Sequence, residues 1–481
     1  MTRPFTLLAT ILFLLSTFSA ADEPMVNHRN SLKHLVLDSR VIAETNNVRL
    51  ALGTVEKDAH NPLFQADKPW ENALNNLYPN VCYDEQERLF KLWYKCVLAD
   101  SNVIAQMMPP RTINNVGWFL CYATSKDGTT WKKPEVGLHG FAGSTKNNAV
   151  ARDVANVGVF KDRHDPDPAR RYKMILDIGV RLPENMRTRV SPDGIHWSDP
   201  VHPDGLGISG DTHSNMFWDE WRKKYVLISR IYLGERLVAR AESADFTHWT
   251  KPEVVLRSLP HEGKNRQTYC MPAFPYANGY LGFVMMYNVS GDKTVDCELV
   301  WSPDSVKWER VLPGTPFIPR GPKESYDAGC VYAQAGDPIL KDGKLWIYYG
   351  GSTAVHRGWK RHCLPCLARL RVDGFAGYEP TKPNGRGTLI TRPLRCAGDA
   401  LRISADVCPG GSLRVTALDG TGATLADSEP LTANATDGVM NWKSGRNWAT
   451  LQGKVVRLRC SLHNAKLYAF DGMRLEAKEQ R

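Results

Sequence analysis

SPDGIHW (191–197) recurs along the chain in altered form. The related heptapeptides are SKDGTTW (125–131), SADFTHW (243–249) and SPDSVKW (302–308). Each follows a run of residues typical of a β-strand and ends in tryptophan. Asp and Gly favour a tight turn, and the indole can pack beneath a neighbouring strand. The heptapeptide therefore predicts a β-hairpin that is repeated within an all-β domain.

A second recurring pattern consists of a strand, a short charged or Gly-containing turn and another strand. It occurs five times, at 81–96, 157–176, 215–230, 272–287 and 330–351. Helical periodicity is almost absent from this region. Five four-stranded units at this spacing indicate a β-propeller with five blades. The segment NVRLALGTVEK (47–57) is expected to add a strand that closes the ring with the last blade.

After about residue 385 the pattern changes to short alternating strands separated by Gly and Asp, such as LRISADV and SLRVTALD. This pattern predicts a small β-sandwich that packs against the propeller. The fold class predicted for the chain is therefore all-β, with a propeller at 47–385 followed by a sandwich at 386–481.

The first residues, MTRPFTLLATILFLLSTFSAADEP, place one Arg before an apolar run that ends in small residues. This arrangement predicts a secretory signal peptide at 1–21, although the run is also nearly long enough for a membrane anchor. No later stretch approaches the roughly 20 apolar residues that a spanning helix needs. We therefore expect a secreted or periplasmic protein without membrane association after cleavage.

The composition narrows the function classes further. The 481 residues carry a net charge of +10 at pH 7, but the basic residues are spread and form no nucleic-acid motif, so no nucleic-acid partner is expected. The densest basic cluster, HRGWKRHC (356–363), either serves an anionic group or forms a solvated loop. CLPC (363–366) has no partner pair, and no His/Cys spacing predicts a zinc site. Neither a metal nor another cofactor is indicated.

Polar segments precede the innermost strand of each predicted blade. They differ from one another, unlike the repeated turns, and they are rich in acidic, basic and aromatic residues. Because innermost strands converge on the axis of a propeller, we expect the functional site there. The segments are NPLFQADKPWENALNNLYPN, NNAVARDVAN, SGDTHSN, NRQTYCM and KESYDAG.

With these features the chain resembles the five-bladed propeller glycoside hydrolases, the group that contains families 32, 43, 68 and 130. The resemblance rests on the S-x-D-G-x-x-W turns, the five predicted blades and the C-terminal sandwich. It implies an enzyme that cleaves glycosidic bonds in oligo- or polysaccharides with a pair of axial carboxylates. Relatives of this fold use acidic residues from different blades. The candidates for catalysis are Asp211, Asp327, Glu71 and Asp153.

The alternatives for these acids are structural. Asp211 would then cap a turn, and Asp153 would only pair with Arg152. The candidates for substrate binding are Trp70, Arg152, His213, Tyr269, Glu324 and His356. The indole of Trp70 would stack on a sugar ring, or else pack in the core. Arg152, Arg266 and Arg320 would suit an anionic sugar or phosphate.

Two other functions fit the same features. A glycoside phosphorylase would replace water by phosphate and would need cationic residues close to the acid. A carbohydrate-binding propeller without catalytic activity would use the same polar residues to bind hydroxyl groups, because a fold alone does not decide function. Paired carboxyl groups across one cavity would favour catalysis over binding.

Overall fold

The structure is a computed structural model. It describes residues 25–26, 30–113, 115–178, 185–208, 210–443 and 448–476. The predicted signal peptide at 1–21 lies outside these residues. Within the described ranges, no helix is long and apolar enough to span a bilayer. Strands predominate throughout, and the predicted all-β class is confirmed.

The first half of the chain forms three antiparallel sheets in succession. The first contains β6 (Asn80–Asp84), β7 (Leu89–Leu98), β9 (Gly117–Ser125) and β11 (Ala149–Arg152). The second contains β12 (Ala155–Lys161), β13 (Tyr172–Asp177) and β14 (Met186–Ser191). The third contains β15 (Asn215–Asp219), β16 (Lys224–Tyr232), β17 (Arg236–Ser243) and β18 (Glu253–Leu256).

Two further groups of strands follow, and one parallel contact between β22 and β24 joins them. The first of them contains β19 (Arg266–Cys270), β20 (Ala273–Tyr276), β21 (Gly279–Asn288), β22 (Val295–Ser302) and β23 (Glu309–Arg310). The other contains β24 (Cys330–Ala333), β25 (Ile339–Lys341), β26 (Lys344–Ser352), β27 (Leu364–Arg371), β5 (Glu56–Lys57) and β1 (Met25–Val26).

These groups close into a ring. β12 contacts both β6 and β15, and β15 contacts β20. A parallel bridge between Asn80 and Ala335 joins the last group to the first. This closed succession of sheets is the arrangement of a β-propeller. It brings the inner strand ends, which are far apart in the sequence, to one axis.

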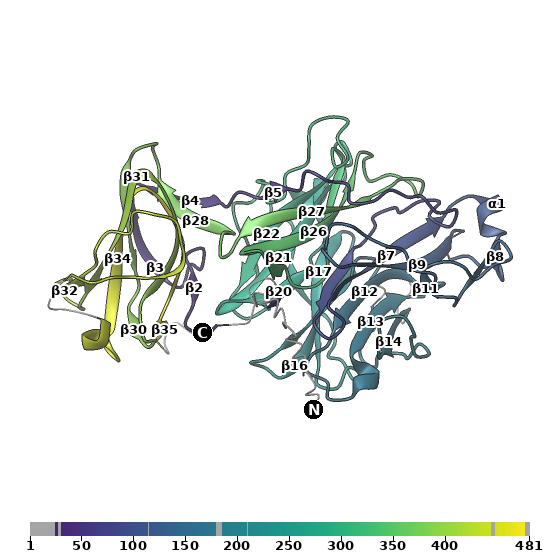
Figure 1. Cartoon of the computed structure of the whole chain (residues 1–481), viewed down its shortest axis with the longest axis horizontal. Coiled ribbons are helices and arrows are strands. Elements are labelled where there is room, and N and C mark those ends of the chain that lie inside the picture. The colour runs from purple at the N-terminus through teal and green to yellow at the C-terminus, as the bar shows by residue number, and fades with distance from the viewer. Residues whose placement is uncertain are drawn as a thin grey trace, which may run out of the picture.

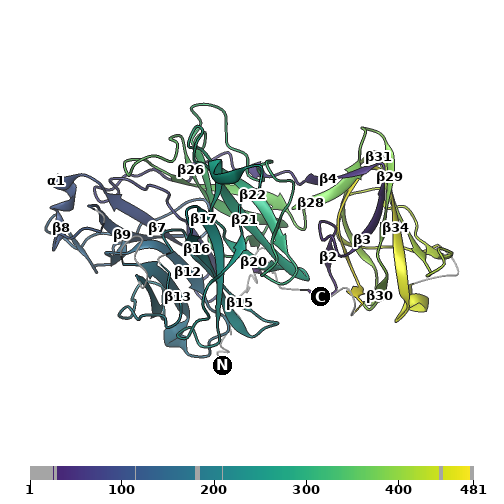
Figure 2. The same ribbon diagram turned by 180° about the vertical axis from the view of Figure 1, so that it is seen from behind.

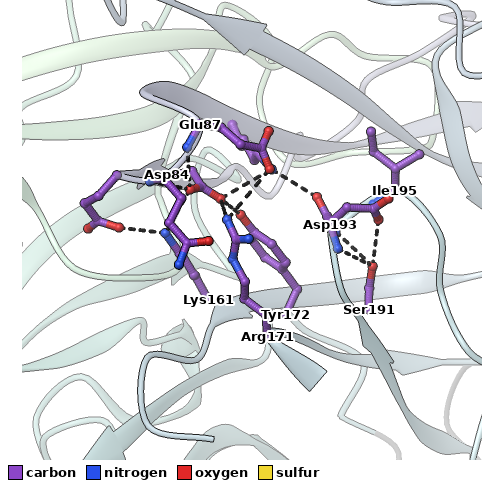
Figure 3. A network of polar contacts seen from close by, with 12 residues as sticks. Asp84, Glu87, Lys161, Arg171, Tyr172, Ser191, Asp193 and Ile195 are labelled. Atoms are coloured by element: carbon purple, nitrogen blue, oxygen red, sulfur yellow. Dashed lines mark hydrogen bonds and ion pairs between the residues drawn. The ribbon is translucent and has the colours of Figure 1, made fainter. Parts of the chain in front are cut away.

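The recurring heptapeptides form tight turns with a shared pattern of hydrogen bonds. In SPDGIHW, Ser191 Oγ accepts from the amide of Gly194 at 2.8 Å, and Asp193 Oδ1 accepts from two further amides at 2.8 Å each. Figure 3 includes Ser191 and Asp193 of this turn. Gly194 has a positive φ of 80°. A Cβ atom at this position would lie 2.4 Å from the Trp93 ring. The turn is therefore tied to the sheet beside it.

A second, separate body follows, and Figures 1 and 2 show it beside the ring. Its main strands are β28 (Ala376–Pro380), β29 (Arg386–Thr391), β31 (Arg402–Leu418) and β34 (Val455–Asp471). We call the sheet that contains them the C-terminal sheet. Its smaller strands are β30 (Leu394–Cys396), β32 (Thr424–Asp427), β33 (Ala435–Val439) and β35 (Met473–Leu475).

The C-terminal sheet also takes up strands from the beginning of the chain, β2 (His34–Leu35), β3 (Ile42–Asn46) and β4 (Val48–Leu52). β3 pairs with β29, and β4 pairs with β28. The segment 47–57, expected to close the ring as one strand, is thus divided. Only β5 reaches the last group of the ring, where it pairs with β27.

The short elements that remain lie at the periphery. They are α1 (Ser101–Ile104), β8 (Met107–Met108), β10 (Gly140–Phe141) and the 3₁₀ turns Pro168–Arg170, Gly263–Asn265 and Trp448–Leu451.

The apolar core is divided in the same way as the fold. One large cluster joins the first, fourth and last groups of the ring, and a separate cluster lies within the C-terminal sheet.

Candidate functional site

A cavity of about 450 Å³ opens where the inner ends of the sheets meet. Every group of the ring contributes to it, which makes it the axial cavity of the propeller. Residues before and within the first sheet meet a loop between β26 and β27 there. The lining residues are Asn75, Asn76, Tyr78, Lys95, Trp118, Asn156, Asp211, Arg230, Arg236, Tyr269, His356, Gly358, Trp359 and Arg361.

Asp211 is the one carboxylate in this lining among the described residues. It lies just before β15, and its backbone has a positive φ of 39°. The carboxylate forms an ion pair with Arg230 at 2.5 Å and keeps 29% of its side chain exposed. Asp211 is therefore fixed in position while it remains accessible to a ligand.

A second carboxyl group, that of Asp177, lies behind Asp211 at the end of β13. Its Oδ2 accepts from the Asp211 amide at 2.9 Å and from Asn156 Nδ2 at 2.8 Å, while its buried Oδ1 has no hydrogen-bond partner among the described residues. Burial, together with the charge of Asp211, raises the pKa of the Asp177 carboxyl well above its ordinary value. Asp177 does not line the cavity and acts on it through Asp211.

Three arginines line the cavity together with Asp211. Arg230 and Arg236 lie 5.2 and 5.8 Å from the centre of the Tyr269 ring. Arg361 donates to the side chain of Asn76 and to the carbonyl of Gly358. Each guanidinium keeps one buried nitrogen without a hydrogen-bond partner in the described part of the chain, Nη1 of Arg230 and Nε of the other two.

Buried donors without acceptors are rare in proteins. Leaving one unpaired costs about 1–3 kcal/mol of stability, and the cost is higher for a charged donor. Three such donors belong to arginines that line one cavity, and the positive charge of these arginines favours an anionic ligand there. Arginine suits such a ligand because its planar guanidinium can donate two parallel hydrogen bonds.

Lys95, in β7, adds a fourth basic group. Its Nζ lies 4.3 Å from the centre of the Tyr78 ring and 5.2 Å from that of Trp118, and it donates to Asn75 Oδ1 at 3.0 Å. Burial, followed by the charge of Arg361, lowers the pKa of Lys95 from 10.5 to about 7. The charge of this lysine therefore changes near neutral pH.

Tyr269 and His356, both predicted as substrate-binding residues, line the cavity. The Tyr269 hydroxyl accepts from Asn76 at 3.1 Å. His356 Nδ1 lies 2.6 Å from the Tyr332 hydroxyl and 2.9 Å from Arg361 Nη2. Burial and the nearby arginines hold the pKa of His356 well below its usual range, so the ring is neutral at pH 7. Both residues can hydrogen-bond a ligand without adding charge.

His213, a further predicted residue, lies beneath the cavity and does not line it. The ring stacks on Tyr78 with centres 4.8 Å apart, and Nε2 lies 3.2 Å from Asn80 Oδ1. Burial, with a contribution from Lys95, lowers the pKa of His213 to about 3. The structure places this histidine as support for Tyr78.

The other predicted acids from the start of the ring lie outside the lining. Glu71 is buried, accepts from the Tyr94 hydroxyl at 2.6 Å and pairs with Lys133 at 2.8 Å. The Trp70 indole donates to Asn148 Oδ1 at 2.8 Å, and its ring meets Phe141 edge-on. These contacts hold the segment before β6 against the first sheet.

Asp153 and Arg152 form an ion pair at 2.9 Å, as the structural alternative expected. Arg152 also donates to the carbonyls of Met108 and Pro109. Asp327 is buried, pairs with Lys57 at 2.6 Å and accepts from the Tyr349 hydroxyl at 3.0 Å.

Glu324, the last predicted residue, is exposed and also lies outside the lining. Arg266 and Arg320, considered for an anionic ligand, are both paired with Asp296. Of the predicted site residues, the structure therefore brings only Asp211, Tyr269 and His356 into the cavity.

The basic residues of the cavity were not among the site residues predicted from the sequence. Lys95, Arg230 and Arg236 lie within strands, where a basic residue is normally read as solvent-facing. Arg361 carried a usable signal, since it belongs to HRGWKRHC, one interpretation of which was an anion site. Asp177 follows the apolar run MIL at a strand end, another position at which a functional acid is worth considering.

No protein-family model matches this chain, and no curated protein matches it. Solved structures with a similar course include an N-acetylgalactosamine deacetylase from F. plautii in complex with blood group B trisaccharide, at 16% identity and a TM-score of 0.41, covering 67% of this chain and 95% of that one. A β-1,2-mannobiose phosphorylase from Listeria innocua matches at 12% identity and a TM-score of 0.45, covering 66% and 97%. A glycosyl hydrolase from Bacteroides ovatus matches at 15% identity and a TM-score of 0.45, covering 67% of this chain and 94% of that one. Such low identities and TM-scores do not transfer an activity to this chain.

Proposed function

We propose that this chain is a glycoside hydrolase that cleaves an acidic oligosaccharide in the axial cavity. The observation that carries the proposal is the placement of Asp211 in the lining of one cavity together with three arginines. The arginines would hold a carboxylate, sulfate or phosphate of the substrate. Asp211 would act as a general base that takes a proton from the attacking water as the glycosidic bond breaks, and the leaving oxygen would take up a proton from solvent.

Several features of the cavity support this assignment of roles. Asp211 is accessible, and its position is fixed from two sides, by the ion pair with Arg230 and by the hydrogen bond from its amide to Asp177. General acid–base catalysis requires such a fixed group within reach of the substrate. Tyr269 and Trp359 add aromatic surface to the lining, on which a sugar ring can pack.

Phosphorolysis is a second candidate, and one specific observation favours it. A two-carboxylate hydrolase needs a second acid across the bond, but Asp211 is the sole carboxylate lining the cavity in the described residues. A phosphorylase needs only one acid, because phosphate bound by the arginines replaces the activated water. In that case the oxyanion is the second reactant rather than part of the sugar.

The test is turnover of matched neutral and acidic oligosaccharides, with and without phosphate, by the wild type and by Asp211→Asn. We expect cleavage of the acidic substrates, and a loss of about 10²–10⁴-fold in kcat for the variant, the usual contribution of a general acid or base. Asp153→Asn should keep its activity, since this acid lies outside the cavity.

Cleavage of neutral substrates that requires phosphate would instead establish the phosphorylase. Full activity of Asp211→Asn on every substrate, with the fold intact by circular dichroism, would overturn both forms of the proposal.

A further inference from the structure

A second hollow lies in the C-terminal sheet, on a body separate from the axial cavity. Its volume is about 380 Å³, and it is formed where β3, β29, β34 and β31 lie side by side. The register of these strands places its side chains in two rows. Arg386, His463 and Ser412 are opposite one another in the first row. Thr388, Ser461 and Arg414 form the second.

These rows face away from the core. Successive side chains of a strand point to opposite faces of a sheet. The residues that alternate with the two rows, Leu389, Cys460 and Leu413, are fully buried in the apolar core of the sheet. Arg386 and Arg414 are exposed, and His463 is half-buried. The hollow is therefore an open, polar surface rather than a gap in the packing.

The charged side chains that line the hollow, Arg386 and Arg414, are both positive. No Asp or Glu lines the hollow in the described chain, and neither Arg386 nor Arg414 forms an ion pair with another described residue. In the adjoining row, Glu44 is paired with Arg457 at 2.5 Å, and Asp427 accepts from the Thr416 hydroxyl at 2.7 Å. An anionic ligand would thus meet two guanidinium groups with no competing carboxylate.

We propose that this hollow binds the carboxylate or sulfate groups of an acidic polysaccharide, separately from the axial cavity. The two arginines flank β34, with the hydroxyl and imidazole groups of Ser461 and His463 between them. Rows two residues apart on a strand lie about 7 Å from each other. A chain lying across the sheet would therefore offer one acidic group to each arginine and its hydroxyls to Ser412, Thr388 and Ser461.

The experiment measures binding of the full-length chain to three polymers, a polyuronate, dextran sulfate and neutral dextran, by affinity electrophoresis. We expect retention by at least one of the acidic polymers and none by neutral dextran. Arg386→Ala/Arg414→Ala should weaken this binding at least tenfold. Retention by the polyuronate alone, or by dextran sulfate alone, would identify the acidic group that the hollow recognises.

A matched control separates this site from diffuse attraction by charge. Arg49→Ala/Arg395→Ala removes the same charge from exposed arginines of the same body, which pair with Glu379 and Glu476. We expect it to weaken binding less than twofold. Equal weakening in the two double variants would overturn the proposal, as would the failure of both acidic polymers to bind.

A third variant, Arg361→Met, excludes the axial cavity as the source of the retention. It removes an oxyanion donor of that cavity and leaves the hollow unchanged. Polymer binding should persist in this variant if the hollow is responsible, and its loss there would overturn the proposal. The two double variants should keep the melting midpoint of the wild type, because the arginines that they exchange are exposed.

Discussion

Two groups of buried charge in this chain differ in how completely they are paired. The first is the network around Asp84, at the turn between β6 and β7 (Figure 3). The Asp84 carboxylate is fully buried and accepts from the Tyr172 hydroxyl and from Arg171. Lys161 Nζ lies 3.2 Å from Asp84 and 2.6 Å from Glu85, so this cation also has its counter-charges.

The consequence of this pairing is seen in the pKa of Asp84. Burial alone would raise it, but the hydrogen bond from Tyr172 and the nearby lysines hold the pKa of Asp84 well below its ordinary value. The network therefore holds two neighbouring sheets together. Its buried carboxylate is satisfied by groups of the chain itself, whereas Arg171 Nε has no hydrogen-bond partner among the described residues.

The axial cavity has the opposite balance. Cations outnumber carboxylates in its lining, and three guanidinium nitrogens are buried without acceptors in the described chain. The comparison teaches that buried charge alone does not mark a functional site in this molecule. What marks it is an excess of positive charge in the lining of a cavity.

The largest expected effect is on stability and concerns the network around Asp84. Asp84→Ala would leave Lys161 and Arg171 without this counter-charge, and we expect a loss of about 3–5 kcal/mol of stability. Arg236→Met, on the unpaired side, should change stability by less than about 1 kcal/mol. Denaturant unfolding of both variants checks this. Similar losses in the two would show that pairing does not distinguish the regions.

A second prediction concerns Lys95 and sharpens the description of the cavity. Its pKa of about 7 means that it is charged at pH 6 and largely neutral at pH 8. We expect affinity for sulfate, whose own charge is constant in this range, to fall about tenfold across it, which corresponds to about 1.4 kcal/mol. Isothermal titration measures the affinity.

Lys95→Met is the control for this pH dependence. Asn75, Tyr78 and Trp118 contact Lys95. The charged or titratable groups that act on it are Arg361, Cys363, Asp211 and Cys270, and His213 is affected by it in turn. The variant should bind sulfate weakly at both pH values. An unchanged fall in affinity between pH 6 and 8 would assign the titration to another group.

The smallest expected effect concerns the repeated turns. Asp193→Ala removes an acceptor for two amides in SPDGIHW, and we expect a loss of about 1 kcal/mol. Burial opposes ionisation here, but hydrogen bonds from His196 and the turn amides lower the pKa of Asp193 from 3.8 to about 2. Its stabilising contribution is therefore present above pH 3.8 and lost as the pH falls through 2.

Thermal unfolding of wild type and Asp193→Ala at several pH values tests this sign. The difference between the two proteins should narrow on acidification towards pH 2. A difference in stability that widens in acid would contradict the lowered pKa of Asp193.

Much of the fold was predictable because it depends on local patterns. The alternation of side chains indicated strands, and the repeated Ser-x-Asp turns indicated hairpins, in which Ser191 and Asp193 now accept amides within a few residues. The site was predictable only in part. Asp211, Tyr269 and His356 line the cavity, whereas Glu71 and Asp327 occur in equally polar segments but are used in ion pairs.

The sequence by itself determined that this chain is built from strands and tight turns, since each depends on residues that are neighbours along the backbone. Tertiary structure alone decided which polar groups meet. Lys95 and Arg361 line one cavity although Lys95 belongs to the first group of the ring and Arg361 to the last. β3 joins β29 across a still longer separation. The physical reason is that closure of the ring and pairing of distant strands set these contacts, and no local pattern records them.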